Sequence, residues 1–486
     1  MVNPSLAALP ERFSARVTFT RTQARGGLLL LAAVVVCTLV MPGIMAALAV
    51  ASAALMFTLI TADRLWLLTS GVIYKNQIIS VDDDVARAIR DEDLPRFTIL
   101  LPAYHEPDIV QSLLIGIGRL EYPRDKLQIL LLLEADDEAT HAALVGQTTG
   151  VQVTVVSVPP SDPRTKPKAC NYALQNYAIT GEFVTIYDAE DQPDPLQLRR
   201  VVHVFATSGD PSLVCLQCRL GYFNERQNLL TRWFSIEYEH WFRYMLPSLG
   251  RRGCPLPLGG TSNHIRTEVL MSLGGWDAFN VTEDADLGIR LARSGYRTGV
   301  LDSITLEEAN SDPINWLRQR SRWYKGYLQT FLVHMRQPRE LVREVGGPTA
   351  IRIIAVTAGM PLINTVNLLF WYGICIWYAG QPAWMGELFP PPVYYGCLAT
   401  FIIGNAATLF VTVVLLRLDG KSHLVGAALL SPLYWVLQSL GAVKGIYQLL
   451  ARPSYWEKTV HGLGGNAAAP TTGTSPHDTD HPGVIA

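Results

Sequence analysis

Acidic residues cluster directly after a short apolar stretch near the middle of the chain. The stretch, Phe183–Tyr187, is rich in apolar and β-branched residues and predicts a buried strand. Asp188, Glu190 and Asp191 follow it, at the end of a strand, where open α/β sheets bind their ligands. Carboxylates this close repel one another unless a cation lies between them, and Mg²⁺ or Mn²⁺ takes oxygen ligands and completes its shell with substrate phosphates. The pattern predicts a divalent-metal site; a merely solvated acidic turn is the alternative.

Three further groups of charged residues have the chemistry of a diphosphate site. Arg and Lys pair with phosphate, a spare carboxylate can remove a proton from an attacking hydroxyl, and an indole offers a flat face to a sugar ring. The groups are Glu134, Asp136 and Asp137 after a second apolar stretch; Glu283, Asp284 and Asp286 before a helix-like stretch; and the basic segment Gln319–Trp323, with Lys166 and Lys168 as further cations.

Each group also has a simpler explanation. The arginines could form a patch on a membrane surface, Glu283 could favour a helix N-terminus, and Trp323 could anchor at a membrane interface. The occurrence of all groups within one α/β unit favours a catalytic site.

The composition limits the partners that the chain can bind. Of 486 residues, 49% are hydrophobic and 17% are charged, and the net charge of -2 provides no basic surface for a nucleic acid. The seven cysteines are scattered, and the C-x-x-C pair Cys215 and Cys218 lacks the second ligand pair of a zinc site. We therefore expect reduced thiols and no nucleic-acid partner.

The N-terminal part of the chain contains an apolar stretch long enough to cross a membrane twice. Residues 1–25 are polar and basic, and residues 26–68 are almost continuously apolar, with a break at Pro42. Because a spanning helix needs about 20 residues, we predict a transmembrane helical hairpin over 26–68. A signal peptide is the alternative, but the apolar stretch continues beyond a cleavage point after Ala51. The basic N-terminus is then expected in the cytoplasm.

Residues 349–450 contain the second set of apolar stretches. The candidate spans are Ile353–Tyr378, Val393–Leu416 and Leu424–Leu450, of which the last is interrupted by Pro432. Three spans would place the basic residues of the tail outside, whereas two spans and an interfacial last segment keep them inside. We expect the second arrangement, with a mostly disordered tail over residues 451–486.

The chain between the apolar ends has the alternating pattern of an α/β domain. A linker over residues 69–94 leads into residues 95–335, where short apolar stretches alternate with helix-like ones. The predicted strands are Phe97–Leu101, Leu127–Leu133, Val151–Val158 and Phe183–Tyr187, and the predicted helices include Val110–Leu120 and Lys168–Tyr177. This order predicts a mostly parallel sheet with functional groups at the carboxyl ends of its strands.

The motifs resemble those of membrane-embedded family 2 glycosyltransferases, the group of cellulose, hyaluronan and poly-N-acetylglucosamine synthases. The resemblance covers about residues 95–335 and the flanking helices. It is carried by Leu133-Glu-Ala-Asp-Asp137, Lys168-Ala-Cys-Asn171, Asp188-Ala-Glu190, Thr282-Glu-Asp284 and the Q-x-x-R-W element Gln319–Trp323. It implies a GT-A fold, Rossmann-like and mostly parallel, inserted between the helices of a multi-pass membrane protein.

The resemblance also implies roles for individual residues. It assigns Asp284 as the general base, Gln319 and Arg322 to the leaving diphosphate, Trp323 to packing under the acceptor sugar, and Asp188 and Glu190 to Mg²⁺ or Mn²⁺. Substrate binding is implied for Glu134 and Asp136 at the nucleoside, Lys168 at the diphosphate, Gly260 and Thr261 at the acceptor, and for Glu283 and Arg320. Two features depart from the family pattern: either Glu190 or Asp191 can meet the metal, and Glu-Ala-Asp-Asp replaces the usual Asp-Asp-Gly after the second strand.

The implied activity is an inverting, metal-dependent transfer of a sugar from a nucleotide-sugar, with a UDP-sugar favoured, to a growing polysaccharide that is exported through the membrane. A single transfer to a lipid-linked or other acceptor is the alternative, and a receptor or assembly protein without activity is a third possibility. We expect a multi-pass protein of the inner (plasma) membrane with a cytoplasmic catalytic domain, a glycan acceptor and an accessory subunit for control.

Two sets of residues in the C-terminal helices bear on export. The aromatic residues Trp371, Tyr372, Trp377, Tyr434 and Trp435 either line a polysaccharide path or form interfacial belts. The polar residues Asn364, Asn367, Asn405 and Gln438 either face a wet channel or form hydrogen bonds between helices.

Overall fold

Strands from the middle of the chain form one eight-stranded sheet. The computed structural model describes residues 6–73, 78–107, 110–144, 152–453, 455 and 457. The strands are β1 (Phe97–Ala103), β2 (Leu127–Glu134), β3 (Thr154–Val158), β4 (Phe183–Ile186), β5 (Gln192–Pro193), β6 (Leu213–Tyr222), β7 (Asn263–Arg266) and β8 (Arg297–Glu307). The predicted start of the third strand at Val151 and the tail from residue 458 lie outside the described residues.

The sheet is parallel in its first half and mixed in its second. Its strand order is β3-β2-β1-β4-β7-β6-β8-β5. The strands β1 to β4 pair in parallel, and so do β6 and β8. Strand β7 runs antiparallel to both β4 and β6, and β5 runs antiparallel to β8. The predicted parallel order therefore holds for the strands that carry the first two acid groups.

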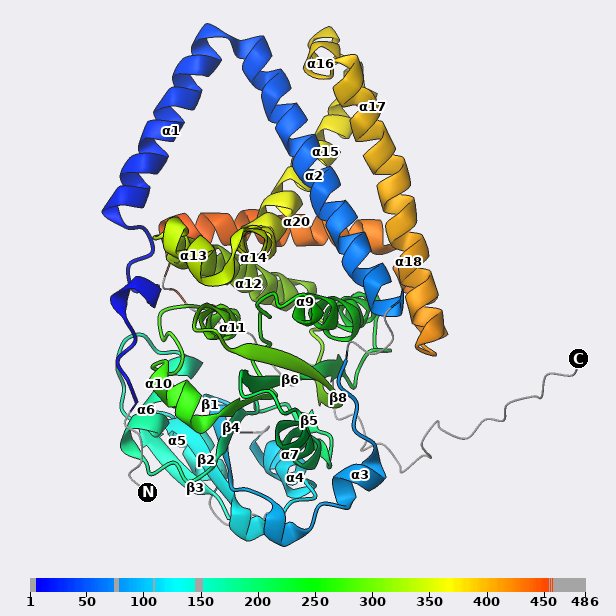
Figure 1. Ribbon diagram of the computed structural model, residues 1–486. Coiled ribbons are helices and arrows are strands. Elements are labelled where there is room, and N and C mark those ends of the chain that lie inside the picture. Colours follow the sequence, from blue (N-terminus) through cyan, green and yellow to red (C-terminus); the bar gives the residue numbers. More distant parts are fainter. Residues whose placement is uncertain are drawn as a thin grey trace, which may run out of the picture.

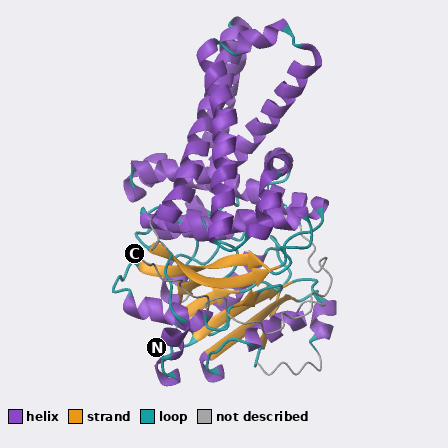
Figure 2. Cartoon of the chain, turned by 90° about the vertical axis from the view of Figure 1, so that its right-hand side faces the viewer, coloured by secondary structure: helices purple, strands orange, loops and turns teal. Residues whose placement is uncertain are grey.

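Helices cover both faces of the sheet because its strands are apolar on both sides (Figures 1 and 2). Ile99 and Leu101 of β1 pack in one core with α4 and α7, and Leu100 packs in the other with α6, α10 and α11. The helices of this domain are α3 (Asp83–Arg87), α4 (Val110–Gly118), α5 (Glu138–Ala143), α6 (Lys166–Asn176), α7 (Gln197–Thr207), α8 (Leu229–Tyr238), α9 (Leu246–Arg251), α10 (Thr267–Ser272), α11 (Glu283–Arg293), α12 (Pro313–His334) and α13 (Pro338–Val345).

Long and short apolar helices lie on one side of the α/β domain (Figure 1). They are α1 (Arg21–Val40), α2 (Pro42–Ile73), α14 (Gly347–Ile354), α15 (Met360–Gly380), α16 (Ala383–Leu388), α17 (Pro391–Ala399), α18 (Asn405–Leu418), α19 (Val425–Leu429) and α20 (Ser431–Ala451). By length and composition, the described residues contain four helices able to cross a membrane, or five if the bent pair formed by 422–429 and 431–451 counts as one span. Two π-helical segments, Glu239–Met245 and Ala355–Gly359, interrupt the helices nearest the domain.

The last helix, α20, lies across the base of the spanning helices rather than along them (Figure 1). The bend before it measures 65°. It packs closely on α12, because a Cβ on Gly441 would lie 2.9 Å from the Arg320 side chain and one on Gly445 would lie 2.8 Å from the Ser321 carbonyl oxygen. This geometry is the one expected of an interfacial last segment.

Candidate active site

A cavity of about 530 Å³ collects most of the predicted site residues. It is lined by the carboxyl ends of β1, β2 and β8, the turn after β4, the start of α11 and one side of α12. The predicted residues on its wall are Glu134, Asp188, Glu190, Gly260, Thr261, Glu283, Asp284, Gln319, Arg320, Arg322 and Trp323. Asp136 and Lys168 are not among the lining residues.

The turn after β4 separates its three acids into two roles. Asp188 and Glu190 line the cavity, whereas Asp191 is only 1% exposed and lies beneath them. The Asp191 carboxylate accepts a hydrogen bond of 2.6 Å from the Asp188 backbone N–H and another from the Thr261 hydroxyl. Glu190 is thus the second cavity acid, and Asp191 holds the shape of the turn.

The two lysines of α6 point to different places. Lys166, at the first position of the helix, pairs with Asp188 and donates to the Gly260 carbonyl oxygen at 2.7 Å. Burial lowers the pKa of Lys166, but the charges of Asp188 and Glu283 outweigh it, so the pKa is raised and the ammonium stays charged. Lys168, the lysine expected at the diphosphate, instead forms an ion pair of 2.7 Å with Glu134.

The nucleoside end of the predicted site is only partly assembled as expected. Glu134 lines the cavity at the end of β2, but Asp136 forms an ion pair of 2.6 Å with Arg164 outside the lining. Arg164 itself lines the cavity and was not predicted. Arg164 follows Asp162-Pro163, and no motif around it marks it as a site residue.

Glu283 and Asp284 form the acidic pair at the start of α11. Burial raises the pKa of Glu283 to about 8, and the charge of Asp284 adds to the rise. Burial also raises the pKa of Asp284 to about 6, against a hydrogen bond from the Ala285 N–H and the charge of Lys166. A Cβ on Gly260 would lie 3.4 Å from Oδ2 of Asp284, so the glycine leaves room beside this carboxylate.

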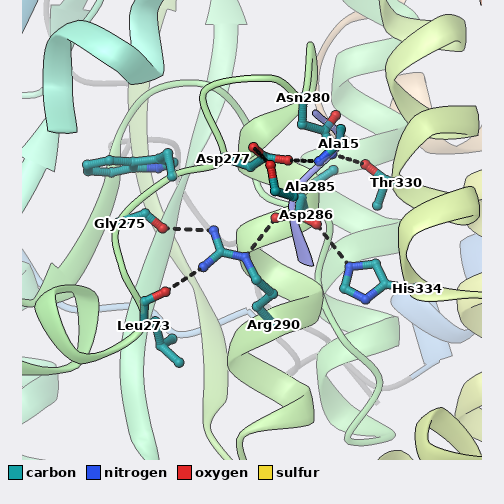
Figure 3. A network of polar contacts seen from close by, with 12 residues as sticks. Ala15, Leu273, Gly275, Asp277, Asn280, Ala285, Asp286, Arg290, Thr330 and His334 are labelled. Carbon is teal, nitrogen blue, oxygen red and sulfur yellow. Dashed lines mark hydrogen bonds and ion pairs between the residues drawn. The ribbon is translucent and has the colours of Figure 1, made fainter. Parts of the chain in front are cut away.

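A buried polar network fixes α11 behind this acidic pair (Figure 3). Arg290 donates to Asp286 at 2.7 Å and to the carbonyl oxygens of Leu273 and Gly275 at 3.0 and 2.8 Å. His334 at the end of α12 lies 3.0 Å from the other Asp286 oxygen. The network joins α11 to α12, the two helices whose side chains meet in the cavity.

The loop before α11 is held from two further sides (Figure 3). Asp277 accepts a hydrogen bond of 2.5 Å from the backbone N–H of Ala15, in the N-terminal segment. Asn280 donates to the Thr330 hydroxyl at 2.9 Å, and the Thr282 methyl group leaves no space for a Cβ on Gly326 of α12. The position of Asp284 therefore depends on three segments that lie far apart in the sequence.

The Q-x-x-R-W element lies on the side of α12 that lines the cavity. Its two arginines have different surroundings. Arg320 forms hydrogen bonds of 2.9 and 2.7 Å with Glu237, so its charge is already paired. Arg322 lines the cavity, where burial lowers its pKa and the charges of Glu283 and Asp188 oppose the fall. Trp323 packs near Tyr238, with ring centroids 6.3 Å apart. Arg322 is thus the arginine placed to meet a ligand anion.

Acids outnumber cations in this cavity, and this imbalance fits a bound divalent ion. Glu307, at the end of β8, also lines the wall; burial and the charges of Asp191 and Glu190 raise its pKa well above the usual range. The described residues contain no group of three His, Cys, Asp or Glu side chains positioned to hold a metal. Asp188 and Glu190 supply the one or two carboxylates that Mg²⁺ uses when substrate phosphates complete its shell.

Glu307, Arg164 and Lys166 are among the charged residues of the cavity wall that received no role from the sequence. Glu307-Glu308 is an acidic pair that ends an alternating stretch, which is the same signal that identified Asp188. An α/β sheet with acids at its strand ends, and a lysine and an arginine facing them, defines a GT-A-type domain, and the predicted fold class is confirmed.

Comparisons with known proteins show which families this domain is similar to. Residues 95–326 match the model described as glycosyltransferase like family 2. A probable glycosyltransferase of Bacillus subtilis is 27% identical over 260 residues, which are 52% of this chain and 60% of that protein. A beta-monoglucosyldiacylglycerol synthase of Synechocystis is 27% identical over 246 residues, 50% of each chain. Over residues 95–326, the chain is thus similar to family 2 glycosyltransferases.

Two further similarities are more distant. A probable glucomannan 4-beta-mannosyltransferase of Arabidopsis thaliana is 25% identical over 268 residues, 53% of this chain and 47% of that protein. A mannosyltransferase from Pyrobaculum calidifontis, solved with GDP-mannose and Mn²⁺, aligns with a TM-score of 0.42 at 19% identity, over 72% of this chain and 99% of that chain. The chain spans about half the length of the curated relatives it matches.

Proposed function

We propose that this chain is an inverting glycosyltransferase that takes a sugar from a nucleotide-sugar and transfers it to an acceptor at the membrane surface. The observation that carries the proposal is one cavity lined by Asp188, Asp284, Arg322 and Trp323, which come from the turn after β4, α11 and α12. Incubation of membranes with a panel of UDP- and GDP-sugars, read out as released nucleotide, tests it. We expect release with one donor, a UDP-sugar being favoured. No release with any donor and acceptor would leave a receptor or assembly protein.

The proposed mechanism follows from the charges on the cavity wall. Asp284 accepts the proton of the acceptor hydroxyl as this oxygen attacks the anomeric carbon. Arg322 and Gln319 face the leaving diphosphate, whose negative charge grows as the bond to the sugar breaks. Trp323 offers its ring to the acceptor sugar, and Lys166 holds Asp188 in position. Attack from the side opposite the leaving group inverts the anomeric configuration.

Removal of divalent metal is expected to abolish transfer. Asp188 and Glu190 would hold Mg²⁺ or Mn²⁺, which when bound supplies positive charge to the diphosphate. Treatment with EDTA, followed by return of each metal to the chelator-free enzyme, should eliminate and then restore nucleotide release. An Asp191→Asn variant, altered beneath the site rather than on its wall, serves as the comparison and should keep its metal requirement. Full activity in EDTA would contradict the assignment.

The pH dependence should report Asp284. Burial raises the pKa of Asp284 to about 6 from the value of 3.8 of a solvated aspartate. A general base works only as the carboxylate, so kcat/KM for transfer should fall as the pH decreases through about 6. The measurement is kcat/KM between pH 5 and 8 at fixed ionic strength. An acidic limb near pH 4 would show that the base is solvated and would contradict this role.

The contacts of the C-terminal helices favour a single transfer to a lipid-linked acceptor over polysaccharide export. Tyr372 and Trp377 are exposed on the surface of the chain, as expected of aromatic belts. Asn364 donates to the Tyr324 hydroxyl at 2.9 Å and Asn367 to the Ser439 hydroxyl at 3.1 Å. These polar groups thus form hydrogen bonds between helices, which is the alternative to a wet channel.

Product length separates the two acceptors. Purified enzyme with labelled donor and a sugar-bearing lipid should add one sugar if the acceptor is a lipid, and a ladder of products if the chain elongates a polysaccharide. One added sugar is the result we expect. A ladder that persists at low enzyme concentration would establish the polysaccharide activity instead.

The proposed location is the inner (plasma) membrane, with the α/β domain in the cytoplasm. Four spanning helices return the domain and the end of α18 to the side of the N-terminus, which carries Arg12, Arg16, Arg21 and Arg25. A thiol-reactive, membrane-impermeant label on an engineered N-terminal cysteine would test it. Labelling of intact cells, and not only of opened vesicles, would contradict the topology.

A further inference from the structure

The cavity continues beyond the catalytic groups to the membrane helices. Its far end is lined by Arg64 of α2, by His240, Phe242 and Met245 of the first π-helical segment, and by Val356 and Met360 near the start of α15. Two of the three π-helical segments in the described residues therefore face this cavity, whereas the third, Thr400–Gly404, does not line it. Such segments occur frequently at functional sites. The acceptor thus has a path to Asp284 from the side of the bilayer.

Arg64 carries a charge that the described residues leave uncompensated. It lies in the last third of the candidate spanning helix α2 and lines the cavity. Its neighbour Asp63 pairs with Arg352. Within the described part of the chain, the Arg64 side chain makes no hydrogen bond or ion pair, and its Nε is buried.

His240 lies beside Arg64 and is also without a partner. It is 3% exposed, and in the described part of the chain neither ring nitrogen has a hydrogen-bond partner. Burial and the charge of Arg64 lower the pKa of His240 to about 3, so the ring is neutral and can donate one hydrogen bond. A guanidinium with a neutral N–H donor beside it suits the charge and the acceptor oxygens of a phosphate.

Helix α12 orders the two ends of the cavity. Tyr324 and Tyr327 both line the cavity, and they are three residues apart, which is about one helical turn. The Tyr324 hydroxyl accepts a hydrogen bond of 2.9 Å from Asn364 of α15, so Tyr324 lies toward the end of the cavity that the start of α15 lines. A sugar ring can occupy the interval between the two tyrosines, next to Trp323.

We propose that Arg64 and His240 bind the phosphate of a membrane lipid that carries the acceptor sugar. The lipid chain lies against Val356 and Met360, the sugar lies beside Trp323, and its hydroxyl meets Asp284. This proposal rests on the proposed glycosyltransferase function and names the acceptor class. The diphosphate of the donor is served by different residues, Arg322 and Gln319, which also line the cavity.

The test compares acceptors that differ only in phosphate. The full chain in nanodiscs is given donor with either a sugar-1-phosphate lipid or the same sugar linked to a neutral lipid. We expect the wild type to show a lower acceptor KM for the phosphate-bearing lipid. Arg64→Met should raise that KM by about 10- to 100-fold, because a charge-assisted hydrogen bond is lost, with little change for the neutral lipid. Arg25→Met, an exposed arginine of α1, is the matched control and should behave as the wild type.

Several outcomes would overturn the proposal. The first is equal use of the phosphate-bearing and the neutral lipid by the wild type. The second is an Arg64→Met variant that keeps the wild-type preference for the phosphate-bearing lipid. The third is a donor KM that rises in Arg64→Met as much as the acceptor KM. Inhibition by millimolar inorganic phosphate that matches the affinity for the lipid would assign the pair to a free anion. If Arg64→Met does not fold, His240→Asn replaces it, and we expect a 3- to 10-fold rise in the same KM. Donor hydrolysis in the absence of acceptor should be equal in all variants. This measurement separates failure of the phosphate-site proposal from failure of the proposed glycosyltransferase function.

Discussion

Asp284→Asn is expected to lower kcat for sugar transfer by about 10²- to 10⁴-fold, the usual contribution of a general base. The amide keeps the size of the side chain and its hydrogen bond from the Ala285 N–H, but it cannot accept the proton of the acceptor hydroxyl. Donor binding should persist because Arg322 and the acids of the turn after β4 are unchanged. Steady-state transfer and donor titration by calorimetry, on the same preparation, measure both quantities.

The control for this variant is a substitution with the same chemistry away from the cavity. Asp93→Asn removes a carboxylate that is paired with Arg90 on the surface, and it should leave kcat within about twofold of the wild type. Retained turnover in Asp284→Asn would remove Asp284 from its role. Loss of donor binding along with turnover would indicate that the substitution disturbs the whole acidic site.

Arg290→Met is expected to lower the free energy of unfolding of the α/β domain by about 3–5 kcal/mol, as breaking a buried ion pair does. Arg290 and Asp286 are both almost fully buried, and Arg290 also satisfies two carbonyl oxygens behind α11. Methionine fills much of the space but leaves Asp286 charged, with only the neutral His334 beside it. Unfolding followed by tryptophan fluorescence in detergent measures the loss.

An exposed ion pair provides the comparison. Arg297→Met breaks the pair with Asp210 at the surface, and such pairs contribute about 0–1 kcal/mol. The midpoint of unfolding should therefore fall far more for Arg290→Met than for Arg297→Met. Equal midpoints would mean that the network behind α11 does not stabilise the domain.

The fold was predictable where one residue pattern allows one structure. The apolar stretches that became β1, β2 and β4 are short, and acids follow β2 and β4, so these strands and the acids at two of their ends were predicted. The antiparallel strand β7 and the β6–β8 pair were not, because a buried strand reads the same in either direction. The pairing partner is decided by contacts across the sheet, which a single stretch of sequence does not contain.

The site was predictable in its residue types more than in their directions. Lys166 and Lys168 are two positions apart on α6, and so are Arg320 and Arg322 on α12, which turns the side chains by about 200° relative to each other. Lys168 therefore lies away from the cavity wall and pairs with Glu134, whereas Lys166 lines the cavity and pairs with Asp188. Arg320 and Arg322 both line the cavity, but Arg320 is held by Glu237. The packing of a helix determines which of its faces points into the cavity, and the motif alone does not determine it. Asp191 likewise points away from the cavity, because its carboxylate accepts a hydrogen bond from the Thr261 hydroxyl.

The close approach of α20 to α12 connects the cavity to a helix that we expect at the membrane surface. Two glycines bring the backbone of α20 against the side chains and carbonyls of the helix that carries Arg322 and Trp323. A helix lying at the lipid headgroups rises, sinks or tilts with the thickness and charge of the leaflet. Since no flexible spacer separates the two helices at this contact, we expect the turnover rate to respond to the lipid composition of the membrane.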